Sequence, residues 1–136
     1  MTAPREDLVQ QVRAWASYAD EDLRLARHAL AMGEESPLRL VAYHAQQCAE
    51  KYLKAFLVWR EIDFPYTHNI AHLLELCAEQ VDWAARLDEA TELTPFAVGA
   101  RYPGHDEPVG DAEARGAVHI ANRVRDVVRQ AFLSEG

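Results

Sequence analysis

The chain has 136 residues, a length typical of one domain with a sizeable core. Hydrophobic residues make up 49% and charged residues 26% of it, as in globular proteins. The formal net charge of −8 argues against a passive, sequence-independent coat on nucleic acid, because binding to phosphates requires an excess of cations. A local basic site remains compatible with this charge.

Membrane and redox signals are weak. No apolar run approaches the roughly 20 residues of a transmembrane helix, and the N-terminus lacks the apolar segment of a signal peptide. Cys48 and Cys77 stand alone, without the spacing of a metal or redox pair. We therefore expect a cytoplasmic protein with buried, reduced thiols and no membrane segment.

The first half of the chain is expected to form two long helices. Apolar residues recur at helical spacing over about residues 5–32, and Gly33 is a natural stop. Ser36 and Pro37 suit the N-cap and the first position of a second helix, which extends to about Glu61.

The second half is expected to contain shorter helices and one long one. Thr67 suits the N-cap of a third helix, which ends near residue 80, and a fourth segment spans about 85–100. A break is expected at Thr94-Pro95, since proline removes a backbone donor. The last helix would start after Asp111 and end near residue 133.

This pattern predicts an all-α fold. Four to five amphipathic helices joined by short loops favour an up-and-down antiparallel helical bundle. No internal repeat and no long linker divides the sequence, so residues 1–136 are expected to form a single domain.

A polar stripe runs along the second helix. Tyr43, Gln47, Glu50 and Lys54 recur at helical steps, almost opposite the apolar face, and are therefore not expected in the monomer's core. The stripe is either a solvated face with an ordinary Glu50–Lys54 pair, or a surface that meets its own copy or lines a cleft.

The loop before the last helix combines residues suited to phosphate chemistry. Arg101 offers a planar fork of donors, Tyr102 an aromatic ring, and His105 an imidazole that can move a proton near neutral pH. These groups suit cleavage of an RNA phosphodiester. The alternative is an arginine packed on its own turn and an exposed histidine.

No metal or cofactor is expected. His68 and His72 are four residues apart, but no acidic third ligand stands beside them at a diagnostic spacing. His68 is instead expected to help close the start of the third helix. Arg115 and His119, with Asn122, are expected to form a solvated polar face on the last helix.

Three segments together resemble the HEPN family (higher eukaryotes and prokaryotes nucleotide-binding domain). The segment 43–54 resembles its second-helix signature, Thr67-His68-Asn69-Ile70 its third-helix start, and Ala100-Arg101-Tyr102-Pro103 its Arg-Tyr-Pro loop. The resemblance covers about residues 8–133. It implies a helical bundle, commonly a homodimer, whose frequent partner is a minimal nucleotidyltransferase in a toxin–antitoxin module.

The resemblance also implies candidate site residues. Many family members are metal-independent ribonucleases in which roughly four to six residues lie between the arginine and the histidine, whereas here only three lie between Arg101 and His105. The leading hypothesis is a dimer cleft that binds nucleotide or RNA through the polar stripe, Arg101 and Tyr102, beside a nucleotidyltransferase partner. The alternatives are an endoribonuclease toxin, with Arg101 and His105 catalytic, and a non-catalytic interaction module.

Overall fold

The computed structural model describes residues 3–99 and 108–135, which contain helices and no strands. The elements in chain order are α1 (Ala3–Leu30), the 3₁₀ turn η1 (Gly33–Glu35), α2 (Leu38–Trp59), α3 (Ile70–Ala78), the 3₁₀ segment η2 (Trp83–Leu93), α4 (Phe96–Gly99) and α5 (Asp111–Glu135). The expected all-α bundle is confirmed.

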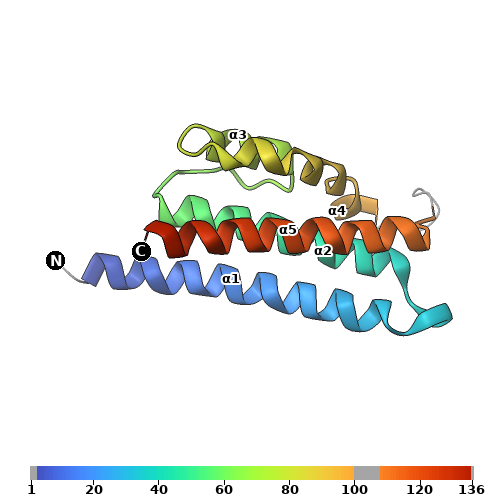
Figure 1. The fold of residues 1–136 in the computed structure, drawn as a ribbon. Coiled ribbons are helices and arrows are strands. Elements are labelled where there is room, and N and C mark those ends of the chain that lie inside the picture. Colours follow the sequence, from blue (N-terminus) through green and yellow to red (C-terminus); the bar gives the residue numbers. More distant parts are fainter. Residues whose placement is uncertain (1–2, 100–107, 136) are drawn as a thin grey trace.

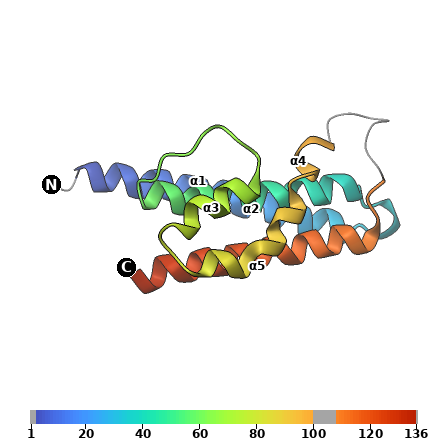
Figure 2. The same ribbon diagram turned by 90° about the horizontal axis from the view of Figure 1, so that it is seen from above.

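The long helices lie side by side, and the shorter elements cover one side of them. α1 is antiparallel to α2 and α5, which run in the same direction (Figures 1 and 2). α3 and η2 form a second layer, which lies on the side of α2 and α5 opposite α1 (Figure 1). They carry the chain from the end of α2 back to the end of the bundle where α5 starts.

α2 is the central element of this arrangement. It contacts α1, α3, η2, α4 and α5, so apolar side chains are buried around most of its circumference. Tyr52 and Phe56 are among the largest fully buried side chains, and the Phe56 ring packs edge-on against Trp83 with centroids 4.9 Å apart. The core is therefore built around α2 rather than on one face of it.

The expected starts of α2 and α3 differ from the structure. Pro37 precedes α2, and its carbonyl oxygen accepts from Val41 N–H at 3.0 Å, whereas Ser36 gives no side-chain cap to that helix. Asn69, not Thr67, caps α3: its side-chain oxygen accepts from His72 N–H at 3.2 Å. Thr67 instead accepts from Asn69 N–H, which turns the chain into the cap. The break at Thr94 is confirmed, because η2 ends at Leu93 and α4 begins at Phe96.

Both cysteines are buried, free thiols, as expected. Burial raises the pKa of Cys77 to about 12. Burial also raises the pKa of Cys48, with Asp20 and Asp22 adding to the shift. The thiolate forms that react with oxidants are therefore disfavoured at neutral pH. No helix in the described part of the chain is both long and apolar enough to cross a membrane.

The central position of α2 can be tested with a matched pair of leucines. Leu53 on α2 is fully buried, whereas Leu25 on α1 is 51% exposed. We predict that Leu53→Ala lowers the free energy of unfolding by roughly 2–5 kcal/mol through lost burial and a residual cavity. Leu25→Ala should change it by less than about 0.5 kcal/mol. Urea denaturation followed by circular dichroism measures both values; similar losses in the two variants would contradict this packing.

Candidate functional site

The carboxylate of Glu50 is the centre of a buried polar network on α2. Gln46 Nε2 donates to Glu50 Oε1 at 2.9 Å, and Lys54 Nζ donates to Oε2 at 2.9 Å. His68 Nδ1 lies 2.7 Å from Oε1. Because an ionised carboxylate only accepts hydrogen bonds, Nδ1 of His68 carries the proton in this contact. These four residues, with Gln47, are called the Glu50 network below.

The expectation that the polar stripe lies outside the core is wrong for three of its four residues. Gln47, Glu50 and Lys54 are only 8%, 3% and 4% exposed. The stripe is covered by the segment between α2 and α3 and by α1, which contribute His68 and aromatic rings. Tyr43 is half-buried and packs edge-on against His44, with centroids 5.1 Å apart.

Aromatic rings surround the ammonium group of Lys54. Its Nζ lies 5.7 Å from the ring centroid of Trp15, and 5.8 Å from those of Phe64 and Tyr66. Cation–π attraction of this kind partly replaces the water that a buried ammonium loses. Lys54 thereby joins α1, α2 and the α2–α3 segment, while Glu50 supplies its counter-charge.

The hydrogen bonds keep Glu50 ionised. Burial alone would raise its pKa, but the donors Lys54, Gln46 and His68, together with the Lys54 charge, lower the pKa below its ordinary value of 4.5. Gln47 completes the network from the side, since its Nε2 donates to Gln46 Oε1 at 2.8 Å.

A second polar seam joins α1 to α2 and α5. Asp22 binds His44 Nδ1 at 2.8 Å and Lys51 Nζ at 2.6 Å. Asp20 accepts from the Tyr52 hydroxyl and from Arg125 Nε, the latter at 2.9 Å. Burial and the hydrogen bond to Asp20 raise the pKa of Tyr52 to about 12, so its hydroxyl remains a donor. The two aspartates thus hold α1 against the other long helices.

His68 and His72 contact different carboxylates. His68 does not close the start of α3, because its Nδ1 is engaged by Glu50. His72 Nδ1 lies 3.7 Å from the Glu75 carboxylate. No group of three or more His, Cys, Asp or Glu side chains that could hold a metal is found among the described residues.

The expected polar face of α5 is exposed at Arg115 and His119 but contacts α1 at Asn122. His119 is exposed, and the Arg115–Asp111 pair is exposed on both sides. Asn122 is half-buried, and its side-chain oxygen accepts from Arg27 of α1. The predicted site residues Arg101, Tyr102 and His105 lie outside the described residues.

Sequence reasoning missed the roles of Gln46 and His68. Gln46 is fully buried, and its spacing of four from Glu50 places it one helical turn before that residue. This regular spacing of Gln46, Glu50 and Lys54 is a signal for a continuous polar chain. The contact from His68 has no such local signal, because it depends on how the α2–α3 segment folds back.

The electrostatics of the Glu50 network predict an acid-dependent stability. Glu50→Gln should lower the free energy of unfolding at neutral pH by about 3 kcal/mol, since Lys54 then loses its buried counter-charge. The native contribution is complete above the ordinary pKa of 4.5 and is lost as the pH falls through the lowered native pKa. The difference between the two proteins should therefore shrink on acidification.

Glu75→Gln is the matched control for this measurement, because the Glu75 side chain is 78% exposed. Its effect should stay below about 0.5 kcal/mol at every pH. Denaturation curves across the acid range provide the comparison. A Glu50→Gln variant with wild-type stability at neutral pH would show that the carboxylate is solvated.

Comparisons with known proteins agree with this fold. The HEPN domain family matches residues 12–131. The crystal structure of TT1696 from Thermus thermophilus aligns with a TM-score of 0.72 and 29% identity, covering 88% of this chain and 97% of that one.

A second solved structure, ST0689, is described as an archaeal HEPN homologue. It aligns with a TM-score of 0.69 and 28% identity, covering 88% of this chain and 96% of its own. A comparison with curated proteins finds no significant match. Since the family match spans nearly all of the described bundle, the chain belongs to the HEPN domain family.

Proposed function

We propose that this HEPN-domain protein forms a homodimer and is the partner of a minimal nucleotidyltransferase in a toxin–antitoxin-type module of the cytoplasm. Nucleotide or RNA would bind in the cleft between the two subunits. The observation that carries the proposal is the HEPN match over residues 12–131, which includes the three motifs that resemble the family signature.

The loop residues would contact the ligand directly. Arg101 would bind a phosphate through its planar fork of donors, and Tyr102 would stack on a base. His105 would serve as acid or base if the cleft cleaves RNA. The position of Arg101 in the sequence supports this role. α4 packs on α2 and ends at Gly99, only two residues before Arg101.

The polar stripe would act mainly by holding the site in shape. Gln47, Glu50 and Lys54 are buried, so their part in ligand binding would be to position neighbouring groups, while the half-buried Tyr43 can offer its ring and hydroxyl. Among these neighbours, His68 is the side chain that the buried Glu50 would orient toward a ligand. Its side chain is 26% exposed, and Glu50 fixes the proton on Nδ1. In the neutral imidazole, Nε2 is then an acceptor.

The proposal is tested by expressing the chain with and without the adjacent reading frame. We predict co-purification of the two proteins, and growth arrest when the chain is expressed alone. Arg101→Ala should relieve the arrest, because the phosphate contact is lost, while Arg86→Ala, at an exposed arginine on η2, should not.

The readouts separate the alternatives. RNA degradation that depends on Arg101 would identify an endoribonuclease. Co-purification that survives Arg101→Ala, with neither growth arrest nor RNA degradation caused by the unmodified chain, would identify a non-catalytic interaction module. A chain that neither co-purifies with the adjacent protein nor arrests growth, or that remains a monomer at high concentration in solution scattering, would contradict the proposal.

A further inference from the structure

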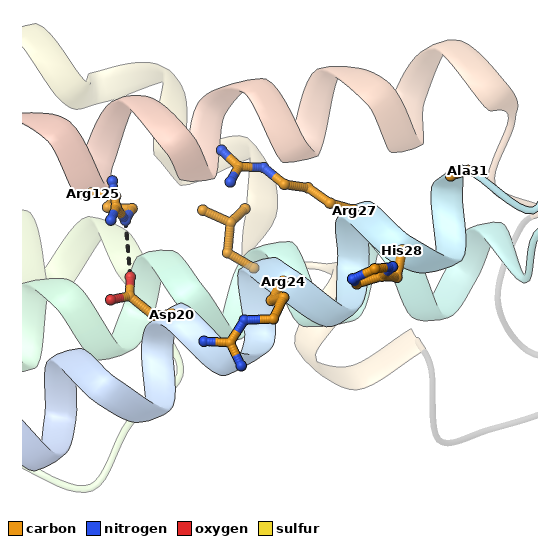
Figure 3. A pocket seen from close by; sticks show the side chains of 7 residues that line it. Asp20, Arg24, Arg27, His28, Ala31 and Arg125 are labelled. Atoms are coloured by element: carbon orange, nitrogen blue, oxygen red, sulfur yellow. Dashed lines mark hydrogen bonds and ion pairs between the residues drawn. The ribbon is translucent and has the colours of Figure 1, made fainter.

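A positively charged pocket lies between α1 and α5, away from the Glu50 network. Figure 3 shows the side chains that line it. Its volume is about 400 Å³. The described lining residues are Asp20, Leu23, Arg24, Arg27, His28, Ala31 and Arg125. Three guanidinium groups therefore face a single carboxylate in this lining, although the whole chain carries a net charge of −8. We call this the α1–α5 pocket.

Two of the arginines are held in place by neighbours. Arg125 Nε binds Asp20 Oδ1 at 2.9 Å, and Arg27 donates to the side-chain oxygen of Asn122 on α5. Figure 3 shows Arg27 reaching from α1 toward α5. Arg125 Nη1 also lies 3.5 Å from Asp126 Oδ1. A guanidinium has five N–H donors, so each arginine retains donors after these contacts. The Asp20 carboxylate is already engaged by Tyr52 and Arg125, which limits its repulsion of an anion.

The remaining lining completes a concave site. Arg24 is exposed and makes no hydrogen bond or ion pair with any other described residue. Leu23 is only 2% exposed and gives the pocket an apolar wall, beside which charged contacts are screened less than in open water. His28, one helical turn after Arg24, adds an imidazole that can donate a hydrogen bond.

We propose that the α1–α5 pocket binds the phosphate group of a nucleotide, either free or within single-stranded RNA. A phosphate presents more oxygens and more charge than a carboxylate, and so matches three guanidinium forks from two helices. A volume of about 400 Å³ falls in the usual range of small-ligand pockets and leaves room for the attached nucleoside. The site goes beyond the proposed function, because it requires neither Arg101 nor a second subunit.

The test is a binding titration of the full chain at low ionic strength. One probe is a short fluorescein-labelled single-stranded RNA, followed by fluorescence anisotropy, and the other is adenosine triphosphate, followed by calorimetry. Arg24→Glu should weaken binding by about tenfold or more, because it replaces a charge-assisted contact with repulsion. For RNA it should also make the salt dependence shallower, by about 0.7 in slope per lost phosphate contact.

Arg86→Glu is the matched control. It makes the same change of charge at an exposed position on η2, in the layer opposite α1, and should leave binding unchanged. Arg24 has no described partner to lose, and circular dichroism checks that the variant keeps its helix content. Binding of RNA alone would assign the site to RNA, and binding of both probes would assign it to nucleotides in general.

Three results would overturn the proposal: no binding of either probe, equal losses in the two glutamate variants, or full binding in Arg24→Glu. The variant Arg101→Ala, measured in the same titration, separates a failure of this proposal from a failure of the proposed function. If only Arg101→Ala abolishes binding, the α1–α5 pocket is excluded while the dimer cleft still stands. If only Arg24→Glu abolishes binding, the pocket is supported independently of the cleft.

Discussion

The ionised carboxylate of Glu50 in the interior constrains much of this fold. Removing such a charge from water is unfavourable unless hydrogen bonds and counter-charges replace the water. Here the partners come from different parts of the chain: Gln46 and Lys54 from α2, and His68 from the segment that leads into α3. The α2–α3 segment must therefore fold back over α2 to satisfy Glu50. Trp15 of α1 meets the same network through Lys54.

The same principle explains how α1 is held. Its two central aspartates are matched by polar groups on other helices: Asp22 by Lys51 and His44, Asp20 by Arg125 and Tyr52. Apolar burial provides the main stabilisation, and these pairs add directional contacts that fix how α1 is placed. The placement also creates the α1–α5 pocket, because Arg125 is drawn to Asp20 at its edge.

The helices could be predicted because their apolar residues recur at helical spacing, and the HEPN motifs could be recognised from local sequence. The sequence does not identify the α3 cap, because Thr67 and Asn69 are both competent caps. The choice depends on contacts such as Ile70 N–H to Thr94 Oγ1, 24 residues away. Helical periodicity does not predict the burial of the polar stripe, because α2 has neighbours on most sides and not on one apolar face alone. The α1–α5 pocket could not be predicted without knowing that α5 lies beside α1.

The claim that Glu50 and Lys54 form an internal pair is tested most directly by a double-mutant cycle with Glu50→Gln and Lys54→Met. The coupling free energy comes from the unfolding free energies of the four proteins. A buried, hydrogen-bonded pair predicts a coupling of about 2 kcal/mol, with the double variant more stable than the sum of the single losses implies. A coupling near the roughly 0.3–0.5 kcal/mol of an exposed helical pair would contradict the account and return the polar stripe to the solvent.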